Sequence, residues 1–286
     1  MERKTNIFKD SIISKIIRYL IILFRRFYIY VTFFNKQIIY PHPTIKIDIV
    51  IPVIDRDFEI LIICILNLKK HIKNNIDNIY IVSNSNKIEK YCQINDLKYI
   101  DENIILSNYS DLINLFNSNR IGWLKQQLIK LHGNYGNNDN YLVIDSDHIL
   151  LSDHIFITND NKFNFYISSG YHNPYYIIIK KLLNIKLNHF SYITHKMIIN
   201  KRILNNLKLD IENYTSKRWD LAIIQNIDFK EKSFFSEFEL YGNYVSSNIK
   251  SHVLWNNKDF SRLNFNPNTI NNSKYNFSTI TFSYYL

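Results

Sequence analysis

Hydrophobic residues follow two different spacings along this chain, and the change between them predicts where helices and strands lie. In residues 11–34, apolar side chains recur at helical spacing. Short apolar runs rich in β-branched residues follow at 45–53 and 79–82, with a helical stretch at 58–68 between them, and we expect a third strand at 104–106. Strands that alternate with helices imply parallel crossovers. We therefore predict an α/β fold with a mostly parallel sheet flanked by helices.

The segment at residues 11–34 is predicted to form a basic amphipathic helix. Four cations interrupt its apolar run and no small-residue cleavage site follows it, which argues against a spanning helix and a cleavable signal peptide. We favour a helix that lies on an anionic membrane surface; the alternative is a helix that packs its apolar face on the protein body. The apolar positions at helical spacing are Ile12, Ile13, Ile16, Ile17, Leu20, Leu23, Phe24 and Phe27.

Breaks in this pattern predict three parts of the chain. Pro41 and Pro43 mark a boundary after the amphipathic segment. We expect a basic N-terminal segment at 1–44, an α/β domain at 45–262 and a tail rich in Asn and aromatic residues at 263–286.

Composition and charge narrow the class of protein. The 286 residues are 46% hydrophobic, which is enough for one large α/β domain. The net charge is +10, but residues 1–36 hold eight basic residues against two acidic ones. The remainder is only mildly basic and predicts no nucleic-acid surface. Cys64 and Cys92 follow no metal-ligand spacing, which favours a reducing, cytoplasmic compartment.

The strongest chemical signal lies at residues 141–147. Four apolar residues predict a central strand buried on both faces, and Asp145 and Asp147 follow at its carboxyl end. Residues two apart in an extended chain point the same way, so both carboxylates can converge on one hard cation. Ligands of such sheets bind beyond the carboxyl ends of the strands, where we also expect the polar clusters at 55–57 and 83–86.

A second signal is the predicted helix at 120–131. Trp123, Gln126, Gln127 and Lys130 share one face of this helix, beside a stripe of leucines. The face suits ligand binding; the alternative is an ordinary amphipathic helix with a solvated polar side.

Four motifs together carry a family resemblance. In their order and spacing the chain resembles the DUF6492 group, a little-characterised bacterial and viral family of GT-A-like glycosyltransferases. The resemblance covers roughly residues 45–260. The motifs are GWLKQQLIKL at 122–131, YLVIDSDHILL at 141–151, FSYITHKMIINKRIL at 190–204 and FFSEFELYGNYV at 234–245.

The resemblance implies a GT-A-like domain with a Rossmann-like nucleotide half, an acceptor half and a divalent cation, Mn²⁺ or Mg²⁺. Asp147 is expected to bind this metal directly, and Asp145 to contact the ribose or the metal. His252 is the expected third ligand; the alternative is an ordinary surface or core histidine. The metal would bridge the donor diphosphate and act as a Lewis acid.

Further roles in binding the donor follow from the same resemblance. Lys130 is expected to reach the diphosphate, with Trp123 and Gln126 on the same face. Asp57 is expected near the base or ribose.

The acceptor end is expected at the acidic cluster 236–239. An inverting enzyme needs a carboxylate that takes the proton from the acceptor hydroxyl, and Glu237 is the first candidate and Glu239 the second. The alternative is a capping box in which Ser236 begins a helix. The polar and aromatic clusters at 171–176, 194–196 and 219–220 are further candidates for an acceptor groove.

These expectations describe a metal-dependent glycosyltransferase. It would move a sugar from a nucleotide-sugar donor to a glycan or lipid-linked acceptor at the cytoplasmic face of a membrane. One alternative is a sugar-phosphate or nucleotidyl transferase with the same two-carboxylate site. The other is a non-catalytic membrane-surface or glycan-binding protein.

Overall fold

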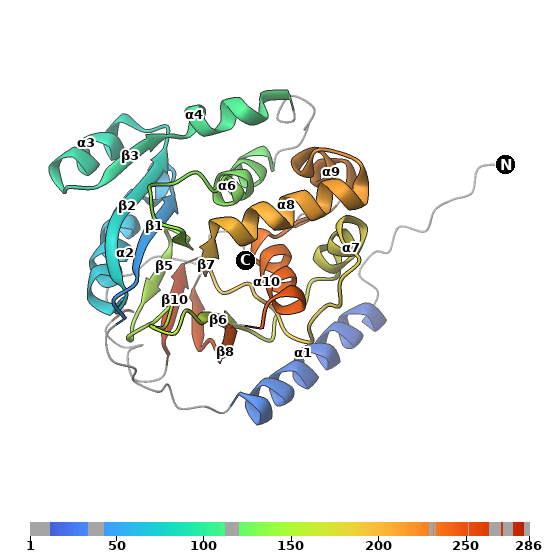
Figure 1. Cartoon of the computed structure of the whole chain (residues 1–286). Coiled ribbons are helices and arrows are strands. Elements are labelled where there is room, and N and C mark those ends of the chain that lie inside the picture. Colours follow the sequence, from blue (N-terminus) through green and yellow to red (C-terminus); the bar gives the residue numbers. More distant parts are fainter. Residues whose placement is uncertain are drawn as a thin grey trace.

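A computed structural model describes residues 12–33, 43–111, 120–228, 231, 233–250, 252–262, 270 and 277–282 (Figure 1). Its centre is a five-stranded sheet with the order β3-β2-β1-β4-β7. β3, β2, β1 and β4 are parallel to one another, and β7 pairs antiparallel with β4. The strands are β1 (Lys46–Pro52), β2 (Asn75–Ser83), β3 (Lys98–Asp101), β4 (Asn140–Ile144) and β7 (Lys196–Asn200).

The predicted α/β fold with a mostly parallel sheet flanked by helices is confirmed. The apolar runs of β1 and β4 are buried along almost their whole length, as expected for central strands covered on both faces. Two short 3₁₀ turns, η1 (Asp55–Asp57) and η2 (Ser107–Tyr109), accompany the helices. The helices that follow β1 along the chain are α2 (Phe58–His71), α3 (Asn86–Ile94), α4 (Glu102–Leu106), α6 (Ile121–Leu131), α7 (Asn173–Leu182), α8 (Lys201–Thr215), α9 (Trp219–Asn226) and α10 (Glu237–Asn248).

One predicted strand is wrong. Residues 104–106 belong to helix α4, and the third strand of the sheet lies just before it at Lys98–Asp101. Asp101 accepts a hydrogen bond from the backbone N–H of Asn103 and so caps this helix. Capping by a local side chain therefore starts a helix where the short apolar run alone suggested a strand.

Two smaller sheets extend the fold beside the central one. The first has the order β5-β10-β9, with β5 (His148–Leu150), β10 (Thr279–Phe282) and β9 (Asp259–Arg262). The second pairs β6 (Phe163–Ile167) with β8 (His252–Asn256). Part of the segment expected as a C-terminal tail therefore forms β10, which lies between the other two strands of its sheet.

The order of the strands creates a crevice between β1 and β4. From β1 the chain moves outward through β2 to β3, and then returns to place β4 on the other side of β1. Such a reversal leaves room beyond the carboxyl ends of the two strands, where α/β proteins bind their ligands. The loops after β1 and β2 meet at this edge as expected, because the Ser85 hydroxyl donates a hydrogen bond to Asp55.

The predicted N-terminal helix is α1 (Ile12–Thr32), which lies along the lower edge of the molecule in Figure 1. In the described parts of the chain, no helix combines the length and apolar character needed to cross a bilayer. Among the side chains of α1 that the structure describes, Arg25 and Ile29 are buried, whereas the apolar side chains from Ile16 to Phe27 at the predicted positions are exposed. Ile12 and Ile13 belong to the helix, but their side chains lie outside what the structure describes.

Candidate metal centre

Pairing between β4 and β7 sets the position of the first candidate ligand. Ile144 at the end of β4 lies opposite Lys196 at the start of β7. One residue further on, the backbone N–H of Asp145 donates to the carbonyl of His195 at 3.0 Å. The side chains of Asp145 and His195 therefore emerge next to each other, although 50 residues separate them in the chain.

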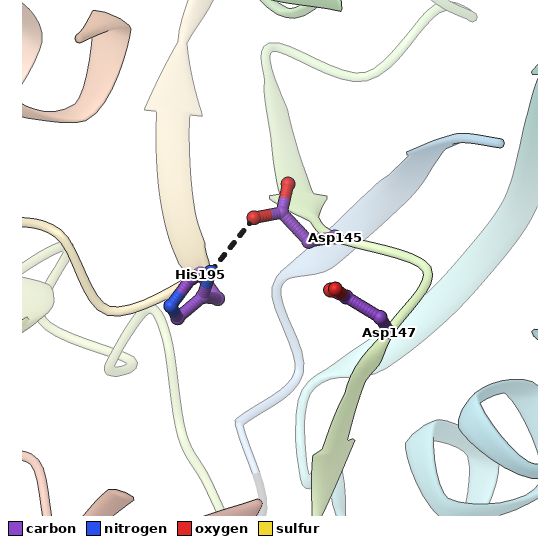
Figure 2. Close-up of side chains that lie close together, drawn as sticks. All are labelled: Asp145, Asp147 and His195. Atoms are coloured by element: carbon purple, nitrogen blue, oxygen red, sulfur yellow. Dashed lines mark hydrogen bonds and ion pairs between the residues drawn. The ribbon is translucent and has the colours of Figure 1, made fainter. Parts of the chain in front are cut away.

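Asp145, Asp147 and His195 form a compact group of potential ligands. One ligand atom from each residue lies within 4.8 Å of those of the other two. The two aspartates flank a turn and His195 faces them from the neighbouring strand end (Figure 2). Two carboxylate oxygens and an imidazole nitrogen suit Mn²⁺ or Mg²⁺, with water or substrate oxygens completing the shell.

His195 adopts an unusual backbone conformation at this point. Its φ angle is +60°, in the left-handed region that non-glycine residues rarely occupy. Such conformations cost about 1–3 kcal/mol and cluster at functional sites. The bend directs the imidazole toward Asp145, whose Oδ2 lies 2.9 Å from Nδ1.

The surroundings of the two aspartates shift their pKa values in opposite directions. Burial alone would raise the pKa of Asp145, but the ammonium of Lys130 and the imidazole of His195 lower it to about 2. Burial first and the adjacent charge of Asp145 second raise the pKa of Asp147 to about 7. A cation bound between the two carboxylates would relieve their repulsion, so the pair fits a metal.

The three potential ligands line a large cavity. Its volume is about 970 Å³, within the range of small-molecule sites. Asp57, Trp123 and Gln126, which we predicted to bind the donor, line the same cavity. The charge of Asp57 also contributes to the raised pKa of Asp147.

Lys130 lies beneath this cavity rather than in its wall. Its side chain is only 2% exposed, and its Nζ lies 2.5 Å from Asp145 Oδ1 and 2.7 Å from Glu237 Oε1. Burial would lower the pKa of Lys130, but the two carboxylates raise it. Lys130 is therefore a buried cation between two carboxylates, and its ion pair with Asp145 helps to fix the position of that side chain.

The two acidic residues expected at the acceptor end are both buried at the start of α10. Ser236 begins this helix, because its hydroxyl accepts the backbone N–H of Glu239 at 3.3 Å, as the capping alternative predicted. Besides the ion pair of its side chain with Lys130, Glu237 donates a hydrogen bond from its backbone N–H to Gln127 Oε1 at 3.0 Å. Glu239 accepts hydrogen bonds from Ser191 and Tyr176. Neither carboxylate is among the residues that line the cavity.

The structure does not bring His252 to the aspartates. His252 lies in β8, where its ring nitrogens are within hydrogen-bonding distance of the Ile249 carbonyl and the Ser246 hydroxyl. Among the described residues, His195 occupies the third place instead. The sequence showed His195 only as part of a polar cluster, because its role depends on the β4–β7 register.

The fold and this group of side chains define an α/β protein with a two-carboxylate, one-histidine site at the crevice of its sheet. The chain belongs to DUF6492, described as a family of unknown function, whose model matches residues 44–270. Comparison with curated proteins finds no match. Among solved structures, the chain is similar to the apo form of mouse xyloside xylosyltransferase 1. The identity is 6%, the TM-score is 0.49, and the match covers 83% of this chain and 97% of that one.

Proposed function

We propose that this protein is a metal-dependent glycosyltransferase that uses a nucleotide-sugar donor. The observation that carries the proposal is the group Asp145, Asp147 and His195 on the wall of the large cavity beyond β1 and β4. Its place at the reversal of the strand order is where α/β sheets bind nucleotides. The family resemblance of the four motifs supports the same reading.

In this proposal the three side chains hold Mn²⁺ or Mg²⁺. The bound metal supplies Lewis-acid stabilisation of the charge that develops on a departing nucleoside diphosphate. Around it, Arg56, Arg120 and Lys125 also line the cavity and provide positive charge for the phosphates.

The indole of Trp123 suits the wall of a donor site. It packs edge-to-face on Phe234, with the ring centroids 4.8 Å apart, and Arg120 lies over its ring. These contacts hold the indole in one orientation at the cavity. We propose that it lies against the base or the sugar of the donor, with Gln126 as a nearby hydrogen-bonding group.

Glu237 has a supporting role in this proposal. Burial raises its pKa, and Lys130 opposes that effect through the 2.7 Å ion pair. A carboxylate committed to this pair helps to hold Lys130 against Asp145. The proton acceptor for an acceptor hydroxyl would then be a group other than Glu237.

A screen of nucleotide sugars for Mn²⁺-dependent hydrolysis tests the proposal. We expect release of a nucleoside diphosphate from at least one donor by the wild-type protein, and loss of that turnover in Asp147→Ala. Asp160→Ala is the matched control, because Asp160 is an exposed aspartate paired with Lys162 away from the cavity.

Other products would point to other functions. Release of a nucleoside monophosphate or pyrophosphate would favour a sugar-phosphate or nucleotidyl transferase. No metal-dependent turnover with any donor, and no thermal shift with Mn²⁺, would favour a non-catalytic binding protein.

A further inference from the structure

Helix α1 docks on the protein through a polar side chain. Arg25 is 6% exposed, and its guanidinium donates hydrogen bonds to the Gly170 carbonyl at 2.5 Å and to the Tyr176 hydroxyl at 2.9 Å. The same group lies over the ring of Tyr171, 4.8 Å from its centroid. Ile29, one turn further along, is buried on the same side. This set of contacts fixes which face of the helix meets the protein.

The opposite face of α1 is apolar and exposed. With 3.6 residues per turn, its large apolar side chains fall within about 160° of the helix circumference, centred opposite Arg25. Their exposed fractions range from 40% to 67%. They are Ile16, Ile17, Tyr19, Leu20, Leu23, Phe24, Phe27, Tyr30 and Val31. A continuous apolar face of this kind on a docked helix marks an interaction surface.

Positive charge borders this apolar face. Lys15 and Arg26 are exposed along one flank of the helix, and Arg18 lies between that flank and the docked side. The helix contains no acidic residue, so nothing in α1 neutralises these cations. An exposed apolar stripe with a basic border is the pattern of helices that lie in the interface of anionic membranes.

We propose that the outer face of α1 binds the surface of an anionic lipid bilayer, with the helix in the plane of the membrane. The apolar side chains would enter the boundary between headgroups and acyl chains, and Lys15 and Arg26 would meet lipid phosphates. A second copy of this chain that packed its α1 antiparallel on this face would instead bring two basic flanks together. An anionic surface fits both the apolar stripe and its charged border.

This orientation also places the large cavity beside the membrane. Arg18 of α1 lines that cavity together with Tyr171, which stacks under Arg25. A second cavity of about 420 Å³ lies between α1 and the body and is bordered by Leu20, Phe24 and Tyr171. If the protein transfers a sugar as proposed, the acceptor class that this geometry favours is a lipid-linked one. That last step rests on the proposed function, whereas membrane binding does not.

Co-sedimentation of the full chain with vesicles tests the proposal. We expect binding to vesicles of phosphatidylcholine and phosphatidylglycerol in equal amounts, and weaker binding to phosphatidylcholine alone. The double variant Ile16→Ser/Phe27→Ser removes two side chains from the centre of the stripe and should weaken binding by at least on the order of tenfold. Lys15→Gln/Arg26→Gln should weaken binding to the mixed vesicles selectively, and added salt should act in the same direction.

Leu66→Ser/Ile94→Ser is the matched control, because both side chains are exposed apolar groups on other helices, 62% and 83% exposed. It should bind vesicles like the wild type, and thermal unfolding should show that all variants fold. Failure of the wild type to bind mixed vesicles, or equal losses in the control, would overturn the proposal. So would a wild-type dimer that becomes a monomer in Ile16→Ser/Phe27→Ser, because a second copy would then cover the stripe. Sedimentation needs no donor and no turnover, so a failed donor screen leaves its result unchanged.

Discussion

The imidazole of His195 donates a hydrogen bond from Nδ1 to Oδ2 of Asp145 at 2.9 Å, across the ends of two antiparallel strands. This bond orients both groups at the wall of the cavity. Burial would lower the pKa of His195, but the bond and charge of Asp145 raise it. The two side chains therefore stabilise each other's charged forms when no metal is bound.

Replacement of His195 should weaken metal binding more than replacement of His252. For His195→Gln we expect a loss of Mn²⁺ affinity on the order of 10–100-fold, measured by isothermal titration calorimetry, because an imidazole contact to the site is lost. His252→Gln is the matched control and should bind Mn²⁺ like the wild type. A larger loss of Mn²⁺ affinity in His252→Gln than in His195→Gln would show that His252, and not His195, binds the metal.

Removal of the buried cation should destabilise the fold. Lys130→Met leaves Glu237 and Asp145 without their shared partner, and we expect a loss of about 3–5 kcal/mol in the free energy of unfolding, measured with urea. The double variant Lys130→Met/Glu237→Gln should recover part of this loss, because one uncompensated charge is gone. A single variant as stable as the wild type would contradict the ion pairs at 2.5 and 2.7 Å.

The metal-free protein should become less stable as the pH rises from weakly acidic to neutral. The pKa of Asp147 is raised from 3.8 to about 7, by burial first and by the charge of Asp145 second. Below pH 3.8 the carboxyl is protonated in both the folded and the unfolded chain. Between 3.8 and about 7 the unfolded chain releases this proton and the folded one keeps it, so the Asp147 contribution to stability falls with rising pH.

Thermal unfolding in metal-free buffer across this pH range measures the effect. Asp147→Asn cannot titrate, so this component of the fall should disappear in the variant. Saturating Mn²⁺ should remove it from the wild type as well, because the cation stabilises the ionised carboxylate. The same fall in Asp147→Asn would show that another group causes it.

Two glycines should respond differently to substitution by alanine. A Cβ at Gly242 in α10 would overlap the ring of Tyr192, and such overpacking costs roughly 1–3 kcal/mol. A Cβ at Gly122, the second residue of α6, would meet nothing within 4 Å, and alanine restricts the unfolded chain more than glycine does. Urea unfolding should therefore show Gly242→Ala less stable, and Gly122→Ala no less stable, than the wild type. Equal stability of the two variants would contradict the close approach of α10 to Tyr192.

The central strands and the two aspartates could be predicted because their signals are local. A run of consecutive apolar residues predicts a strand buried on both faces, and β1 and β4 are buried in this way. The spacing of Asp145 and Asp147 after such a strand directs two carboxylates to one side. The amphipathic helix at residues 12–32 followed from its periodicity in the same way.

Tertiary structure alone decided which residues join those aspartates. His195 reaches Asp145 through the register of β4 and β7, and Lys130 meets Glu237 across 107 positions of the chain. No local pattern encodes such contacts, because they depend on how distant segments pack. The same holds for α1: its sequence showed an apolar face and a basic face, but the contacts of Arg25 decided which side the protein body covers. Periodicity reports the faces of an element, and only packing determines what each face meets.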